Sequence, residues 1–214
     1  MTPESPPDTA EPQSHAAPPR VGVLALQGDV REHVAALRSL GAEVVLVRTP
    51  HDLGTVDGLV LPGGESTTID KLSRIFGLRE PIRDRVADGM PVLGTCAGLI
   101  LLADRIVDGL PDQQTFGGLD VTVQRNAFGS QRDSFEIDLD MPLVCDDPVH
   151  AVFIRGPLVT EVGPSATVLG ALPDGRVVAI EQDNLIGIAF HPEVAGETRL
   201  HRHFLARVAA GDAD

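Results

Sequence analysis

The fold of this chain is decided by the stretch Pro91-Val92-Leu93-Gly94-Thr95-Cys96-Ala97-Gly98-Leu99-Ile100-Leu101-Leu102-Ala103. Residues 91–93 are apolar and strand-like, Gly94 and Gly98 bracket a tight turn, and residues 99–103 continue as a helix. A strand that enters a helix through such a turn is typical of the nucleophile elbow of α/β proteins. At the start of that helix, Cys96 would feel the positive end of the helix dipole, which favours a thiolate. The stretch therefore predicts an α/β fold with Cys96 as a nucleophile.

Apolar strands alternate with helical patterns on the N-terminal side of this elbow. Strands are expected at residues 21–27, 42–47 and 58–61, and helices at residues 30–40, 67–76 and 80–88, with Gly41 ending the first helix. This alternation indicates a central, mostly parallel sheet with helices on both faces, as in flavodoxin-like three-layer folds.

The second half of the chain is richer in strands. We expect them at residues 119–124, 134–139, 151–154, 166–172, 177–181 and 185–190, with a final helix at residues 198–208. Pro173-Asp174-Gly175 predicts a hairpin turn between two of these strands. The C-terminal half therefore adds antiparallel strands to the fold.

The tripeptide His191-Pro192-Glu193 follows Cys96 by 95 residues, at the end of the last expected strand. A thiol nucleophile needs a histidine that moves the proton and a carboxylate that orients the imidazole. Either motif alone is usually structural, because a cysteine after a strand is often only a small buried side chain. Together they predict a Cys96, His191 and Glu193 triad.

A second turn, Pro62-Gly63-Gly64, also follows a buried strand. Two successive glycines allow a backbone N–H to face an active site, so the N–H groups of Gly64 and Ala97 are predicted to form an oxyanion hole. Gln27, Gly64 and Cys96 each lie at the carboxyl end of an expected strand, where ligand sites of parallel sheets form. We expect these residues to converge.

Three segments together resemble class I, or triad-type, glutamine amidotransferases: residues 62–66 (Pro-Gly-Gly-Glu-Ser), 94–98 (Gly-Thr-Cys-Ala-Gly) and 191–193 (His-Pro-Glu). Others are similar to one branch, the glutaminase subunit of pyridoxal 5′-phosphate synthase: residues 25–33 (Ala-Leu-Gln-Gly-Asp-Val-Arg-Glu-His), 124–129 (Gln-Arg-Asn-Ala-Phe-Gly) and 153–157 (Phe-Ile-Arg-Gly-Pro). The resemblance spans residues 21–208.

The resemblance implies hydrolysis of L-glutamine through a thioester on the cysteine, with the ammonia delivered to a separate synthase subunit that makes pyridoxal 5′-phosphate, the active form of vitamin B6. This chain itself would carry no cofactor. The residues that match glutamine-binding positions of the family are Gly64, Glu65, Ser66, Arg125, Ile154 and Arg155. Gln27 matches a residue near the oxyanion loop or the subunit interface.

Composition limits the partners and the location. A formal net charge of −14 argues against nucleic acid or an anionic membrane surface as a partner. No metal site is evident, and Cys145, beside acidic residues, is interpreted as structural or incidental. Residues 1–20 are rich in Pro, Glu, Asp, Ser and Thr and are expected to form a disordered tail before a glutaminase domain at residues 21–210. No apolar stretch is long enough to span a membrane, and a cytoplasmic enzyme is expected.

Three alternatives remain open at this stage. An amidotransferase could serve another synthase, such as that of imidazole glycerol phosphate, although residues 27–33 and 125–129 argue against it. A cysteine peptidase or γ-glutamyl hydrolase on the same fold would need no partner. A non-catalytic regulatory module is disfavoured because Cys96, His191 and Glu193 are all present.

Overall fold

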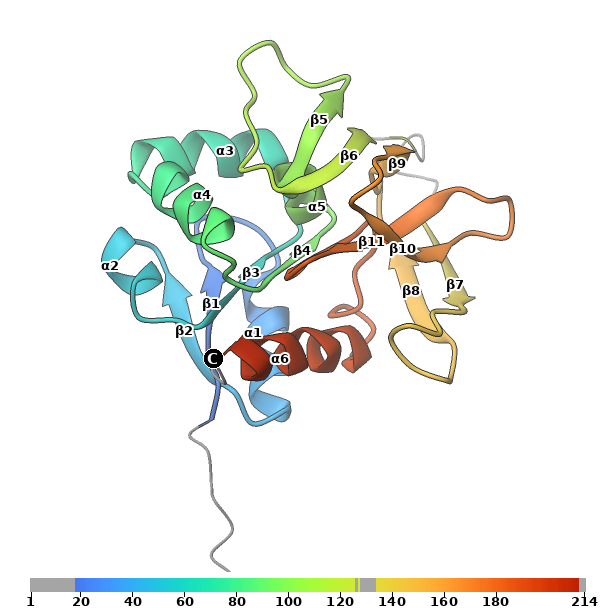
Figure 1. The fold of residues 1–214 in the computed structure, drawn as a ribbon, viewed down its shortest axis with the longest axis horizontal. Helices are drawn as coiled ribbons and strands as arrows, with labels where there is room; N and C mark the ends of the chain where they lie inside the picture. Colours follow the sequence, from blue (N-terminus) through green and yellow to red (C-terminus); the bar gives the residue numbers. More distant parts are fainter. Residues whose placement is uncertain (1–17, 126, 128–133, 212–214) are drawn as a thin grey trace, which may run out of the picture.

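A computed structural model describes residues 18–125, 127 and 134–211 (Figure 1). Five parallel strands form the half of the sheet that carries the elbow. In spatial order they are β2 (Glu43–Val47), β1 (Arg20–Leu24), β3 (Gly58–Leu61), β4 (Val92–Thr95) and β12 (Leu185–Ile188). The order reverses between β1 and β3, the position where open α/β sheets bind ligands.

Antiparallel strands extend the sheet beyond β12, as the sequence predicts for the C-terminal half. The extension comprises β11 (Val177–Gln182), β9 (Leu158–Val162), β6 (Leu119–Gln124) and β5 (Ala103–Val107), with β10 (Thr167–Ala171) paired to β11. Within it, β5 and β6 run parallel to each other. Strands β7 (Phe135–Leu139) and β8 (Val149–Phe153) form a separate antiparallel pair.

Helices cover both faces of the parallel half (Figure 1). Helices α1 (Val30–Ser39) and α6 (Arg199–Gly211) lie side by side on one face. The other face carries α3 (Ser66–Ile75), α4 (Arg79–Ala87) and α5 (Ala97–Leu102). The three-layer α/β fold expected from the sequence is confirmed.

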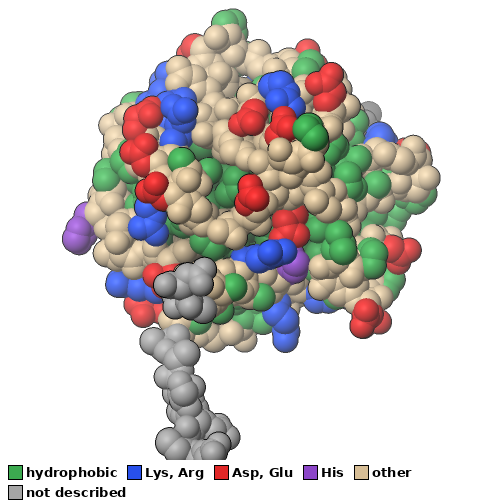
Figure 2. All heavy atoms as spheres, in the orientation of Figure 1, with side chains coloured by type: hydrophobic (Ala, Val, Ile, Leu, Met, Phe, Trp, Pro, Cys, Tyr) green, Lys and Arg blue, Asp and Glu red, His purple; other side chains and the backbone are tan. Residues whose placement is uncertain are grey.

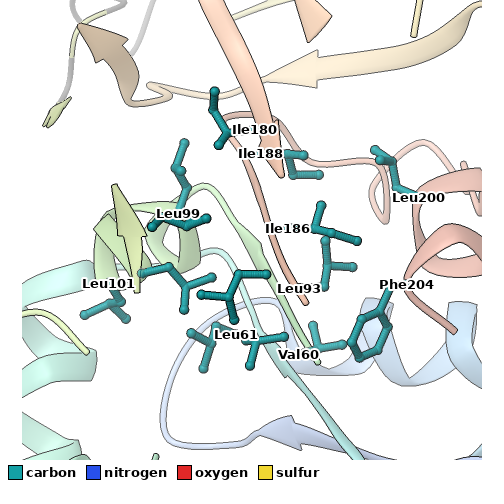
Figure 3. Close-up of a cluster of buried hydrophobic side chains, with 14 of the residues drawn as sticks. Val60, Leu61, Leu93, Leu99, Leu101, Ile180, Ile186, Ile188, Leu200 and Phe204 are labelled. Atoms are coloured by element: carbon teal, nitrogen blue, oxygen red, sulfur yellow. The ribbon is translucent and has the colours of Figure 1, made fainter. Parts of the chain in front are cut away.

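The core lies between these layers. Figure 3 shows Leu99 and Leu101 of α5 on one side of the buried strands, and Leu200 and Phe204 of α6 on the other. Close approach of α5 to the sheet depends on small residues: a Cβ added to Gly98 would lie 2.2 Å from the carbonyl oxygen of Leu61 in β3. The glycines that frame the elbow thus set the packing distance of its helix.

Several expected boundaries were wrong. The first strand ends at Leu24, three residues early, because the chain turns at its carboxyl end to form the loop that carries Gln27. The helix after the elbow ends at Leu102, because residues 103–107 form β5. The strand β9 and the single-turn helix α2 (Pro50–Leu53) were not expected. The first strand begins at Arg20, inside the expected tail; the rest of that tail lies almost wholly outside the described residues.

Charged side chains of both signs are interspersed on the face of the molecule in Figure 2. Within the described residues, no helix combines the length and the apolar character needed to cross a membrane.

Candidate active site

Cys96 occupies a strained position between β4 and α5. It is the N-cap of α5, with φ 48° and ψ −97°, a region that non-glycine residues rarely adopt. Its backbone N–H donates to the carbonyl of Ile188 in β12, at 2.8 Å. The strain and this anchor present the thiol at the carboxyl end of the sheet, as expected of an elbow nucleophile.

His191 lies three residues after the end of β12, and its position is fixed from two sides. Its backbone N–H donates to the carbonyl of Val152 in β8, at 2.8 Å. Its Nδ1 lies 3.0 Å from Oε1 of Glu193, which is buried. Cys96, His191 and Glu193 therefore come together as the sequence predicts.

Asp29, at the N-cap of α1, also contacts this histidine. Its Oδ2 lies 3.3 Å from Nδ1 of His191. Burial alone would lower the pKa of His191, but hydrogen bonds with Asp29, Cys96 and Glu193 outweigh burial and raise the pKa to about 12. The arrangement favours the imidazolium form of His191.

Buried histidines continue the network behind Glu193. Nε2 of His33 lies 3.4 Å from Oε1 of Glu193 and 3.1 Å from Oγ1 of Thr95, and its Nδ1 lies 2.9 Å from Nε2 of His201. Burial lowers the pKa of His33 well below its usual value and that of His201 to about 4, so both are neutral at pH 7. Burial raises the pKa of Glu193. The ionised form of Glu193 favours a proton on Nε2 of His33, which leaves Nδ1 to accept from His201.

The glycine loop after β3 is held by the loop after β1. The N–H of Asp29 donates to the carbonyl of Gly63 at 3.1 Å, and Oε1 of Gln27 accepts the N–H of Glu65 at 2.7 Å. Gly28 makes this contact possible, because a Cβ there would lie only 1.8 Å from the carbonyl oxygen of Gly63. Gly64 has φ 150°, within the range that favours glycine.

Two of the expected glutamine-binding residues make an ion pair at the rim. Nη2 of Arg125, which follows β6, lies 2.9 Å from Oε1 of Glu65. Ser66 lies elsewhere: its side chain is buried and its Oγ accepts from Nε2 of Gln113 at 3.0 Å. Asn126 and residues 128–129 of the segment after Arg125 lie outside the described residues.

These elements enclose a cavity of about 300 Å³, within the range of small-ligand pockets. It is lined by Gln27, Asp29, Gly64, Glu65, Cys96, Ile154, Arg155 and His191. The expected convergence of Gln27, Gly64 and Cys96 is thus observed. Arg155, with φ 50°, follows β8, so the separate two-stranded sheet also contributes to the cavity.

Comparisons with known proteins identify the family of the chain. The sequence model of the SNO glutamine amidotransferase family matches residues 23–210. This chain belongs to the SNO glutamine amidotransferase family. It is accordingly an enzyme of the glutamine-hydrolysing class.

Relatives within the family are similar along nearly their whole length. A protein of Leifsonia xyli subsp. xyli named "Pyridoxal 5'-phosphate synthase subunit PdxT" is 63% identical over 193 residues, which cover 90% of this chain and 98% of that protein. A protein of the same name from Clavibacter michiganensis subsp. michiganensis is 61% identical, covering 92% of this chain and 94% of that protein. A solved "Crystal structure of glutamine amidotransferase" is 45% identical with a TM-score of 0.82, covering 88% of this chain and 98% of that chain.

In this amidotransferase, Asp29, His191 and Glu193 also form the one group in the described part of the chain with donor atoms close enough for a metal ion, within 4.8 Å of one another. Both carboxylates contact the same nitrogen, Nδ1 of His191. Glu193 is within hydrogen-bond distance of that nitrogen, at 3.0 Å, and Asp29 makes an ion-pair contact with it at 3.3 Å, so the group is better explained as two carboxylates around a histidine than as a ligand set.

Sequence reasoning missed Asp29, His33 and His201 as parts of the site of this family member. Asp29 precedes a helix, where Asp is usually interpreted as a cap. Helical spacing could have indicated that His33 is buried. It lies three residues after Val30 and three before Ala36, on the side of α1 that faces the core. The contact with His201 joins residues 168 positions apart and has no local signal.

Proposed function

We propose that the chain hydrolyses L-glutamine to L-glutamate and ammonia through Cys96, His191 and Glu193, and passes the ammonia to a pyridoxal 5′-phosphate synthase subunit. The observation that carries this proposal is the strained Cys96 at the start of α5, paired with His191 inside a cavity beside a glycine loop. The pathway is supported by the name shared by the similar bacterial proteins.

The reaction would proceed in two halves. The Cys96 thiolate attacks the side-chain amide carbon of glutamine, and His191 protonates the departing nitrogen as the C–N bond breaks, giving ammonia and a thioester. Water then attacks the thioester while His191 accepts a proton, and the C–S bond breaks to release glutamate and the thiolate. Glu193 keeps the imidazole oriented throughout.

Each half passes through a tetrahedral oxyanion, for which the N–H groups of Gly64 and Ala97 are the proposed donors. Ala97 follows the nucleophile in α5, the usual position of one donor in elbow sites. Gly64 lies on the loop held by Gln27 and Asp29, so the conformation of this loop determines where the N–H of Gly64, the second donor, points. One such donor contributes roughly 3 kcal/mol to lowering the barrier.

The α-amino acid end of glutamine would lie toward Glu65, Ile154 and Arg155. Arg155 lines the cavity and offers a forked donor for the α-carboxylate, while the Glu65 carboxylate suits the α-ammonium group. Arg125 holds Glu65 at the rim through their ion pair. The Ser66 side chain, engaged with Gln113, would act on glutamine only indirectly.

Gln27 offers a route by which a partner could control the site. It lines the polar cavity and also a neighbouring, more apolar hollow of about 550 Å³ over α1 and β2, which includes Leu26, Val34 and Leu46. A synthase subunit that filled this hollow would contact Gln27, whose Oε1 holds the N–H of Glu65. Docking could in this way reset the glycine loop.

The test is ammonia release from glutamine by the purified chain, with and without the pyridoxal 5′-phosphate synthase subunit, beside a Cys96→Ala control. Strong stimulation by the subunit that is lost in the control is the expected result. Full turnover without the subunit would overturn the proposal of a synthase partner, and the chain would then be an autonomous glutamine hydrolase. No turnover under either condition would overturn the reaction itself.

A further inference from the structure

The side chain of Asp29 does not cap the helix that this residue precedes. It is the N-cap of α1, yet its carboxylate makes no capping hydrogen bond to that helix. Asp is among the strongest N-cap residues, so a carboxylate that leaves this role forgoes a stabilising bond. The side chain instead lies half-buried in the cavity wall, with Oδ2 3.3 Å from Nδ1 of His191.

Nδ1 of His191 consequently faces two carboxylates, Asp29 and the buried Glu193 at 3.0 Å. A neutral imidazole has one N–H at this position, which a single carboxylate satisfies. A second carboxylate is favourable chiefly when the ring carries a full positive charge. The bond to His191 lowers the pKa of Asp29, so this carboxyl is ionised at neutral pH.

The backbone of Asp29 is tied to the glycine loop. Its N–H donates to the carbonyl of Gly63 at 3.1 Å. A Cβ added to Gly63 would lie 2.8 Å from Oδ2 of Asp29 and 2.4 Å from Cε1 of His191, so the loop packs against both partners of the ion pair. A shift of the glycine loop would therefore also move the Asp29 carboxylate relative to the histidine.

We propose that Asp29 is a positioning residue that stabilises the His191 imidazolium as a second carboxylate and couples it to the glycine loop. The proposal rests on the proposed glutaminase reaction, in which that imidazolium protonates the departing nitrogen. Asp29 acts through His191 and not on the substrate.

The direct test measures protonation of His191 without turnover. A Cys96→Ala background removes the contacts of Cys96 that help to raise the pKa of His191 to about 12. In this background the imidazole ¹⁵N resonances of His191 are followed between pH 5 and pH 12, with Asp29 or with Asp29→Asn. A His191→Gln sample assigns the resonances. We expect Asp29→Asn to lower the midpoint of His191 by about one pH unit, and Asp29→Glu to restore most of it.

Two further samples make the result specific. Asp174→Asn, in an exposed turn where Asp174 pairs with Arg176, should leave the midpoint unchanged. In otherwise wild-type protein with the synthase subunit, Asp29→Asn should lower kcat by up to about tenfold, with little change in KM for glutamine. The loss arises in hydrolysis of the thioester, where neutral His191 accepts a proton and becomes positively charged, and one pH unit of lost stabilisation corresponds to a factor of ten.

A His191 midpoint that does not move in a folded Asp29→Asn protein would overturn the proposal, even if activity fell. Absence of glutaminase activity in the wild type would refute the proposed function, yet the titration would still decide the role of Asp29.

Discussion

Replacing Gly28 with alanine should separate catalysis from folding. Gly28 has φ 109°, and an added Cβ would lie 1.8 Å from the carbonyl oxygen of Gly63. Because real Cβ atoms essentially never come closer than 3.0 Å to another heavy atom, the two backbones must part by at least 1.2 Å along this contact. That displacement moves the peptide that carries the N–H of Gly64, one of the two proposed oxyanion donors.

The expected cost divides into two parts. A non-glycine residue at this positive φ destabilises the fold by about 1–3 kcal/mol. Loss of one oxyanion donor costs roughly 3 kcal/mol of barrier, a fall in kcat of about 10²–10³-fold. Gly41→Ala is the matched control, because Gly41 has φ 86° but nothing within 4 Å of its Cβ, so it carries the backbone strain alone.

Both variants would be assayed for ammonia release with the synthase subunit and for urea unfolding. The chain has no Trp and no Tyr, so unfolding is followed by circular dichroism and not by intrinsic fluorescence. We expect Gly41→Ala to lose stability and keep its kcat, and Gly28→Ala to lose both. A folded Gly28→Ala protein with a kcat within threefold of wild type would refute the role given to the loop.

Three other predictions concern pH, packing and the partner. Because burial lowers the pKa of His201 from 6.5 to about 4, the unfolded chain binds the extra proton, so His201 alone should lower the free energy of unfolding by about 3 kcal/mol between pH 6.5 and pH 4. His201→Asn should reduce the change of the free energy of unfolding with pH in this range, measured by urea unfolding. An unchanged pH dependence would contradict the prediction. Gly98→Ala drives a Cβ to 2.2 Å from the backbone oxygen of Leu61 and should cost about 1–3 kcal/mol, measured in the same way; wild-type stability would show that α5 can move away from the sheet. Val34→Arg, in the hollow over α1, should abolish stimulation by the synthase subunit while labelling of Cys96 by a glutamine-like electrophile persists; full stimulation would show that the partner docks elsewhere.

The elements that could be predicted from the sequence are those whose residues form a local pattern. The elbow around Cys96 and the strand that precedes His191 are each specified within about ten residues, so their types were correct and only their ends were wrong. The strand β5 was missed because residues 103–107 follow α5 directly and show no turn signal at Ala103. Short elements such as α2 carry a signal, since Thr49 and Asp52 form a capping box, but a single turn has no helical period.

The charge environment of the site could not be predicted, because it depends on contacts between distant segments. Asp29 reaches His191 across more than 160 residues of chain, and its local context predicts a helix cap. The His33–His201 pair joins α1 and α6. The sequence of each helix predicts a buried face, but not that these two faces meet. The spatial order of the strands decides these contacts, and sequence patterns specify that order only through the fold as a whole.

The pairing of β4 with β12 also determines when the site can exist. Ile188 lies opposite Thr95 in that pairing, so the nucleophile and its base come from neighbouring strands, although 95 residues separate Cys96 from His191 along the chain. On a ribosome, Cys96 is therefore made long before the strand that brings its base. Throughout that interval the thiol lacks the histidine that would take its proton. The proposed site can form only when β12 pairs with β4, so Cys96 meets His191 only after residues 185–191 have been made and have joined the sheet.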